Sequence, residues 1–230
     1  MTSSLIVVFA KRPEPGKVKT RMCPPLSPEE AALLYAAMLD DVLETTMHAA
    51  RAADAHPCLV VHPPEATREM AALCPAGYRV EAQHGVGLAE RMAHAVATAA
   101  SAGYDRILLR GSDSPAMPAD LLVRGLASLD AADLAIGPDP DGGYGWIALR
   151  RPVPGLFDHP MSTSSVFDDT LANARAQGLR AKILEPHFDL DTAEDFARLA
   201  RVRREGGAAS CARTLAVLDE HAFWRFAPEG

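Results

Sequence analysis

A cluster of basic residues lies early in the chain, in the segment FAKRPEPGKVKTRM at positions 9–22. The segment has five basic residues and one acidic residue, although the whole chain has a formal net charge of -7. Ammonium and guanidinium groups neutralise phosphate oxygens, and we assign this role to Lys11, Lys19 and Arg21. Gly16 would let the backbone approach such a phosphate closely. The cluster fits one small anion, and a solvated basic loop without a ligand is the alternative.

Acidic residues at later positions predict a cation site. Asp113 follows an apolar run in LLRGSDSPAMP, at the expected tip of a strand. Mg²⁺ and Mn²⁺ take oxygen ligands and bridge to phosphate groups. Asp189 and Asp191 lie in the extended segment HFDLDTAED, and we expect them to point to opposite faces, so that at most one readily joins Asp113. The alternatives are that Asp113 only caps the next turn and that Asp191 only begins a helix.

Two further loops are candidates for the rest of the site. The segment QHGVGLAERM follows an expected strand and opens a helix, and it supplies Gln83 and Arg91 as contacts for a base or a phosphate. Its two glycines match only half of a dinucleotide fingerprint, so we expect no nicotinamide site. The segment GPDPDGGYGWIAL has a strong turn signal, and a plain hairpin is its simplest interpretation. Residues around this turn could also line an acceptor pocket: Asp141, Gly142, Gly143 and Tyr144.

Alternating strands and helices must position these loops. Strands are expected at residues 4–10, 59–61, 78–83 and 107–109, within DLAIGP and GYGWIALR, and at AKILE. Helices are expected at residues 28–53, 88–100 and 118–129, from Ser162 or Ser164 to about 177, and from a capping box at Thr192 and Asp195 to about 204. This order predicts one α/β domain whose mainly parallel central sheet is flanked by helices. Ligands of such sheets bind at the C-terminal ends of the strands, where the candidate residues lie.

Composition excludes several other classes of protein. The chain has 230 residues, 48% apolar and 23% charged, as in an ordinary globular domain. Its acidic net charge argues against nucleic acid as a partner. None of its four cysteines forms a CxxC pair, which favours reduced thiols over a disulfide framework. The early apolar run at residues 5–10 is too short for a membrane span or a signal peptide. We therefore expect a cytoplasmic protein without a membrane partner.

Five segments together resemble a bacterial glycosyltransferase-like family whose members often neighbour arsenosugar-biosynthesis genes. The segments are FAKRPEPGKVKTRM, GSDSP, DPDGGYGWIAL, STSSVFDDTL and FDLDTAEDF. The family belongs to the nucleotide-diphospho-sugar transferase superfamily, which has the GT-A fold and also contains molybdenum-cofactor nucleotidyltransferases and 2-phospholactate guanylyltransferases. The resemblance implies that the first loop holds nucleotide phosphates, that Asp113 and Asp191 bind the metal, and that the acceptor lies near Asp141. Departures from the family pattern bear more on the acceptor pocket than on the phosphate site: Gly87, Ser114, Gly145 and Met161.

The leading hypothesis is a metal-dependent transferase with a nucleotide-activated donor. Asp113 and Lys19 would be its catalytic residues, and Mg²⁺ or Mn²⁺ its cofactor. The family resemblance favours a nucleotide-sugar as donor and a small molecule as acceptor. The alternative is a guanylyl- or cytidylyltransferase-like enzyme that takes a nucleoside triphosphate and releases pyrophosphate. A second alternative is a non-catalytic nucleotide-binding module, which would not need the metal-binding carboxylates.

The end of the chain is expected to form a helical extension. We divide the sequence into a transferase domain, residues 1–205, and an extension, residues 206–230, with Gly206 and Gly207 as a hinge. The extension is expected to be one helix over residues 208–226. Its apolar residues need a partner surface: Leu215, Val217, Leu218, Phe223, Trp224 and Phe226. That surface is either the same chain or a second copy related by a two-fold axis, so the protein is a monomer or a homodimer.

Overall fold

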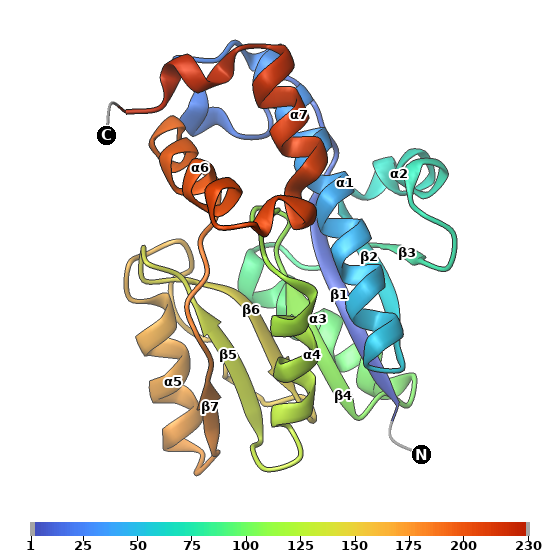
Figure 1. Ribbon diagram of the computed structural model, residues 1–230. Helices are drawn as coiled ribbons and strands as arrows, with labels where there is room; N and C mark the ends of the chain where they lie inside the picture. The colour runs from blue at the N-terminus through green and yellow to red at the C-terminus, as the bar shows by residue number, and fades with distance from the viewer. Residues whose placement is uncertain (1–2, 229–230) are drawn as a thin grey trace.

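A seven-stranded sheet runs through the centre of the molecule (Figure 1). The computed structural model describes residues 3–228. The strand order is β3-β2-β1-β4-β6-β5-β7. Strand β6 is antiparallel to both of its neighbours and the other pairs are parallel, which confirms the expected mainly parallel sheet. The strands are β1 Ser4–Lys11, β2 Ala55–His62, β3 Arg79–Ala82, β4 Arg106–Arg110, β5 Leu134–Pro138, β6 Tyr144–Leu149 and β7 Ala181–Ile183.

Helices cover both faces of the sheet. Helices α3 (Leu88–Ser101) and α5 (Val166–Ala176) bury their apolar sides against one face. Helices α1 (Pro28–Ala52) and α4 (Ala119–Ser128) pack on the other face. The remaining helices are α2 Thr67–Leu73, α6 Phe196–Arg204 and α7 Ala212–Glu220. The result is a three-layer α/β domain of the kind the sequence predicts.

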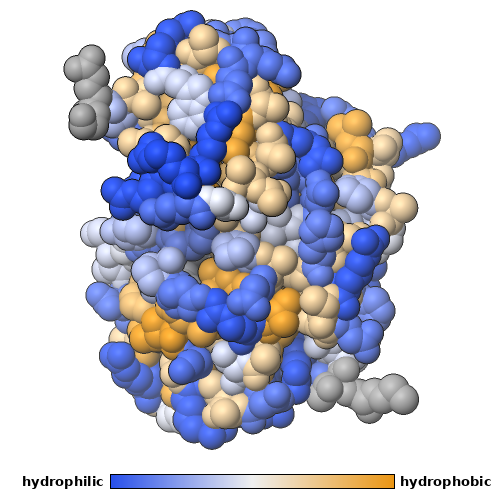
Figure 2. Space-filling model, viewed as in Figure 1, coloured by the Kyte–Doolittle hydropathy of each residue, from blue (hydrophilic) through white to orange (hydrophobic). Residues whose placement is uncertain are grey.

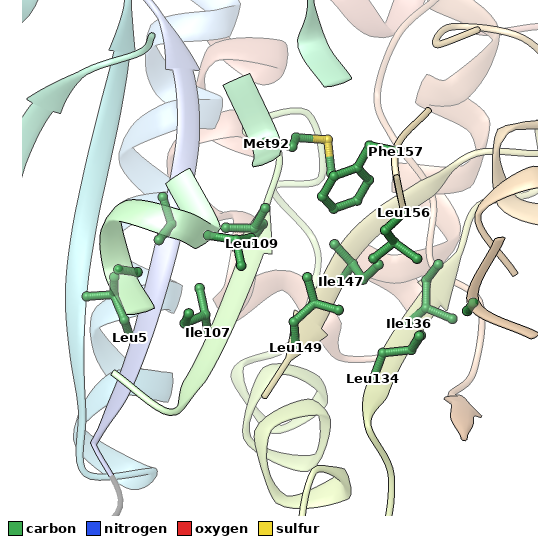
Figure 3. Close-up of a cluster of buried hydrophobic side chains, with 14 of the residues drawn as sticks. Leu5, Met92, Ile107, Leu109, Leu134, Ile136, Ile147, Leu149, Leu156 and Phe157 are labelled. Atoms are coloured by element: carbon green, nitrogen blue, oxygen red, sulfur yellow. The ribbon is translucent and has the colours of Figure 1, made fainter. Parts of the chain in front are cut away.

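Alternation along the strands divides the core into two layers. In β1, Leu5 and Val7 join the cluster under α3, whereas Ile6 joins the cluster under α1 and α4, because successive residues of a strand point to opposite faces. Figure 3 shows the first layer, in which leucine and isoleucine side chains from β1, β4, β5 and β6 gather on one face of the sheet. This packing fixes the ends of the strands from which the candidate loops emerge.

Helix α1 begins as the sequence predicts. The hydroxyl of Ser27 accepts a hydrogen bond from the backbone N–H of Glu30 at 3.1 Å, and the Glu30 carboxylate accepts one from the N–H of Ser27 at 2.7 Å. Pro28 occupies the first helical position. This reciprocal capping box satisfies backbone donors that a helix start leaves free. Helix α5 differs from the prediction, since it begins after Ser165 and is capped by neither Ser162 nor Ser164.

The C-terminal segment packs on α1 of the same chain (Figure 1). Leu215 and Leu218 of α7 and Phe223 are buried in a cluster with Leu34 and Met38 of α1. The expectation of one helix over residues 208–226 is wrong. A 3-10 helix covers Gly207–Cys211, α7 ends at Glu220, and a second 3-10 helix covers Phe223–Phe226. The break comes at Ala222, whose φ of 55° is left-handed and cannot continue an α-helix.

The surface is mostly polar in the view of Figure 2, with apolar side chains gathered in a few places. Hydrophobic side chains form a band across the lower half of the molecule, over the area of β5 and β7 in Figure 1. Ile183 of the edge strand β7 is 46% exposed. Within residues 3–228, no helix has both the length and the apolar composition needed to cross a bilayer.

Candidate functional site

A cavity of about 790 Å³ lies at the C-terminal ends of β1 and β4 and beside β6. It is lined by most of the residues that the sequence predicts for the site: Lys11, Lys19, Arg21, Gln83, Arg91, Asp113, Asp141, Gly143, Tyr144 and Asp191. Gly16 and Gly142 lie outside this lining. Loops that are far apart in the sequence therefore meet at one opening, as expected for the strand ends of an α/β sheet.

Lys19 joins the two carboxylates that the sequence assigns to a metal. Its ammonium forms ion pairs with Asp113 and with Asp191, the latter at 2.8 Å. The Lys19 side chain is only 4% exposed, whereas both carboxylates are partly exposed. Burial alone would lower the pKa of the ammonium, but the two carboxylates outweigh it and raise the pKa above its ordinary value. Lys19 therefore stays charged at the centre of the site.

The backbone of Lys19 has an unusual conformation. Its φ of 46° and ψ of 37° are left-handed, which costs a non-glycine residue about 1–2 kcal/mol. Lys19 directly precedes the 3-10 helix Thr20–Met22, in which Met22 is buried. Strain of this kind persists where surrounding contacts hold it and often marks a functional position. Here buried Val18 and Met22 on either side of Lys19 hold the backbone, and the two ion pairs orient the side chain inward.

Asp189 supplies a third carboxylate, which the sequence analysis considered but did not assign to the site. It lines the cavity together with Asp191, so the expectation that the two point to opposite faces is wrong. Residues two apart in an extended segment share a face, and the intervening Leu190 is the one that turns away into the core. The backbone N–H of Leu190 donates to the carbonyl of Asp113 at 2.8 Å. This bond fixes the two acidic loops side by side.

Asp189 and Asp139 form a buried acidic pair. The hydroxyl of Ser114 donates to the Asp189 carboxylate. Burial, followed by the charge of Asp113, raises the pKa of Asp189. Burial, followed by the charge of Asp189, raises the pKa of Asp139. The pair therefore retains protons at a pH where an exposed aspartate would lose them, and adds less negative charge to the cavity than two ordinary aspartates would.

Gln83 and Arg91 line the cavity, and both side chains donate hydrogen bonds to backbone carbonyls. The Gln83 amide donates to the carbonyls of Ala10 at 3.0 Å and Val60 at 2.9 Å, which ties β1 to β2. The Arg91 guanidinium donates to the carbonyls of Gly85 at 3.1 Å and Val86 at 3.3 Å. Both side chains shape the loop after β3, and their predicted contacts with a base or phosphate remain a prediction.

The two glycines outside the lining act through the backbone. Gly16 has a φ of 73°, and a Cβ there would meet nothing within 4 Å, so the turn rather than a close approach requires glycine. Gly142 has a φ of 91°, and a Cβ there would lie 2.0 Å from the carbonyl oxygen of Ser164. The predicted acceptor turn thus packs directly on the loop that carries Ser162, Thr163 and Ser164, which also line the cavity.

Tyr35 connects the basic loop to the acidic loop. Its hydroxyl accepts a hydrogen bond from the backbone N–H of Lys11 at 3.0 Å and pairs with the hydroxyl of Ser112 at 2.8 Å. Burial, with a smaller effect of the Asp113 charge, raises the pKa of Tyr35 to about 12. The residue lies in the first third of α1, and nothing in the sequence separates it from an ordinary core aromatic.

Comparison with known protein families identifies the family of this chain. The family model described as "Uncharacterized protein conserved in bacteria (DUF2064)" matches residues 45–164, just over half of the chain. The chain belongs to the DUF2064 family. A relative from Sphaerobacter thermophilus, named phosphoenolpyruvate guanylyltransferase, is 33% identical over 186 residues, which cover 79% of this chain and 86% of that protein.

Solved structures confirm the expected fold. A structure from Desulfovibrio desulfuricans G20, named provisionally as a nucleotide-diphospho-sugar transferase, matches with a TM-score of 0.86 and 32% identity and covers 100% of both chains. A cytidylyltransferase from Leptospira borgpetersenii covers 96% of both chains with a TM-score of 0.56 and 13% identity, and therefore supports the fold alone. The chain has the nucleotide-diphospho-sugar transferase fold, and the expectation of a transferase is confirmed.

Proposed function

We propose that this protein transfers a nucleotidyl group from a nucleoside triphosphate to a small phosphorylated acceptor and releases pyrophosphate. This was the alternative to glycosyl transfer in the sequence analysis, and two findings now favour it. The relative that covers 79% of the chain is named a guanylyltransferase. The basic loop and the acidic loops line the same cavity, and this observation carries the proposal because a triphosphate needs several cationic contacts.

The carboxylates are suited to a divalent cation. Oxygens of Asp113 and Asp191 are both within hydrogen-bond distance of one point, the Lys19 ammonium. Mg²⁺ keeps several waters and phosphate oxygens as ligands and needs only one or two carboxylates from the protein. Among residues 3–228, no three His, Cys, Asp or Glu side chains are arranged to enclose an ion by themselves, which agrees with such an open site. Asp113 and Asp191 would hold Mg²⁺ or Mn²⁺, and the ion would neutralise charge on the departing pyrophosphate.

Basic residues would bind the phosphates of the donor. Lys11 and Arg21 line the cavity and are exposed to solvent, so they can reach an incoming triphosphate. A phosphate oxygen of the acceptor attacks the α-phosphorus of the triphosphate. A new phosphorus–oxygen bond forms, the bond to the bridging oxygen breaks, and pyrophosphate leaves with the electron pair. Lys11 and Arg21 stabilise the charge that develops on pyrophosphate.

The part of the cavity beside the turn between β5 and β6 is suited to the acceptor. Asp141, Gly143 and Tyr144 lie there against the loop of Ser162, Thr163 and Ser164. Hydroxyl and backbone N–H groups bind phosphate and carboxylate oxygens. The relative's name contains phosphoenolpyruvate, a small molecule that carries both of these groups. We therefore infer a small phosphorylated acid as the acceptor.

The decisive experiment measures pyrophosphate. The protein is incubated with each common nucleoside triphosphate, with Mg²⁺ or Mn²⁺, and with phosphoenolpyruvate or a related phosphorylated acid. We expect pyrophosphate release with at least one base, and its loss in Asp113→Asn. A matched control is Asp120→Asn, which changes an exposed aspartate of α4. Release of a nucleoside diphosphate from a nucleotide-sugar, without pyrophosphate from any triphosphate, would restore the glycosyltransferase hypothesis.

A further inference from the structure

Lys19 occupies the position between the two carboxylates assigned to the metal. Its ammonium contacts Oδ1 of Asp113 and Oδ1 of Asp191. Asp113 and Asp191 would hold a divalent cation through carboxylate oxygens, which such ions take at about 2.0–2.6 Å. An ammonium within hydrogen-bond distance of the same oxygens fills the same space and carries a charge of the same sign. The metal and the Lys19 ammonium therefore exclude one another at this point.

The frame around Lys19 is held independently of its ammonium. Val18, immediately before it, is buried with Tyr35. Met22 is buried in the cluster that joins α1 to the C-terminal segment. The Leu190 N–H to Asp113 carbonyl bond fixes the acidic loops to one another. A lysine side chain has a flexible four-carbon stem. The side chain can therefore move between partners while the loop and the carboxylates stay in place.

We propose that the Lys19 ammonium acts as a resident cation that holds the place of the metal until the metal–nucleotide complex arrives, an inference that rests on the proposed function. With the complex bound, Asp113 and Asp191 would hold the ion, and the Lys19 ammonium would pair with a phosphate oxygen of the same nucleotide. Metal alone must displace the ammonium without offering it a new anionic partner. Lys19 thus couples metal binding to nucleotide binding and disfavours occupation by metal without substrate.

The first test is binding of Mn²⁺ alone to the full-length protein, measured by calorimetry. Lys19→Gln removes the resident cation, and we expect it to bind Mn²⁺ at least about fivefold more tightly than the wild type, at the lower end of typical coupling between linked sites. Lys17→Gln is a matched control, because it removes the same charge from an exposed residue of the same loop. Arg21→Gln removes a charge 3.7 Å from Asp191 that does not lie between the two carboxylates.

The outcomes distinguish mutual exclusion of the metal and the Lys19 ammonium from a general effect of removing one positive charge. The proposal is supported if Lys19→Gln gains Mn²⁺ affinity while Lys17→Gln does not and Arg21→Gln gains clearly less. It is overturned if Lys19→Gln binds Mn²⁺ no more tightly than the wild type, or if Arg21→Gln gains as much. These titrations contain no nucleotide. If Lys19→Gln gains Mn²⁺ affinity but the wild type releases no pyrophosphate, the proposed function is refuted and the resident cation stands. If the wild type releases pyrophosphate but Lys19→Gln gains no Mn²⁺ affinity, only the resident cation is refuted.

A second test needs no variant. The buried Lys19 amine of the wild type is expected to resist acetylation, measured by mass spectrometry of its peptide. Saturating Mn²⁺ alone should displace the amine and increase its modification severalfold, and Mn²⁺ with a non-hydrolysable triphosphate should protect it again. Exposed Lys17, in the same loop, should be modified equally in all three states. Unchanged modification of Lys19 when Mn²⁺ saturates the protein would overturn the proposal.

Discussion

Replacing Asp41 should release helix α7 from the rest of the protein. Asp41 lies in α1 and is buried. Its carboxylate accepts hydrogen bonds from the backbone N–H of Thr214 at 2.8 Å, the Thr214 hydroxyl at 2.7 Å and the backbone N–H of Arg213 at 3.1 Å. The residue at the N-cap position of α7, Cys211, makes no side-chain cap. A side chain from α1 therefore caps α7 across a gap of more than 170 residues in sequence.

The expected cost follows from the donors that lose their acceptor. Asp41→Ala leaves three donors without a partner, and Thr214, which carries two of them, is buried. A buried donor left unsatisfied costs about 1–3 kcal/mol, so the two buried donors of Thr214 account for most of the cost. We expect the free energy of unfolding to fall by roughly 3–5 kcal/mol. Asp41→Asn keeps one acceptor oxygen and should lose about half as much.

The assay combines denaturation with hydrogen exchange. Urea unfolding followed by circular dichroism gives the change in free energy, and exchange measured by mass spectrometry should show loss of protection concentrated in α7. Glu44→Gln is the control, because it breaks an exposed ion pair with Arg213 and should cost less than about 1 kcal/mol. A loss below about 1 kcal/mol for Asp41→Ala, or an equal loss of protection throughout the sheet, would refute the reasoning.

Three further predictions concern the frame of the site. Gly137→Ala would place a Cβ 2.1 Å from the buried indole nitrogen of Trp146, and urea unfolding should show a loss of about 1–3 kcal/mol; wild-type stability would contradict this packing. Tyr35→Phe leaves the Lys11 N–H and the Ser112 hydroxyl without this partner and should lower the free energy of unfolding by about 1–3 kcal/mol. It should also lower the rate of pyrophosphate release, and an unchanged rate would show that Tyr35 does not position the site. The pKa of Asp139 is raised in the folded protein. Between the ordinary aspartate pKa and this raised pKa, the folded state therefore binds more protons than the unfolded state. The free energy of unfolding falls as the pH rises through this range. Asp139→Asn should flatten this fall in denaturation at several pH values, and parallel wild-type and variant profiles would contradict it.

The strands and most helices could be predicted because their signals are local. The apolar run of β1 and the capping box at Ser27 and Glu30 depend on residues within a few positions of one another. Placing candidate residues after strands was also enough to bring Asp113 and the basic loop to one cavity, since parallel strands end at the same edge of a sheet. Helix α2 was not predicted, because its seven residues are too short to show a helical period. The break at Ala222 has no sequence signal, because alanine rarely adopts a left-handed conformation.

The contacts of individual site residues could not be predicted, because they depend on the tertiary fold. The sequence identifies Gln83 and Arg91 as polar groups after a strand, but it does not show that both donate to backbone carbonyls. It likewise contains Tyr35 without showing that its hydroxyl lies between two functional loops. The error at Asp189 was of another kind, since the two-residue spacing to Asp191 already indicates a shared face.

Lys19 combines a phosphate-binding role assigned from the sequence with a pairing to two aspartates that only the structure shows. A basic loop facing acidic loops was interpreted as phosphate ligands facing metal ligands, which is the arrangement expected with substrate bound. Without substrate, Asp113 and Asp191 would repel one another across a shared space, and a cation between them lowers that energy. Lys19 is the group that the fold places there. A metal–nucleotide complex brings both a replacement cation for the carboxylates and an anion for the lysine. The same ammonium can therefore stabilise the carboxylates before binding and the phosphates after it, so its pairing with aspartate and its predicted phosphate role are compatible.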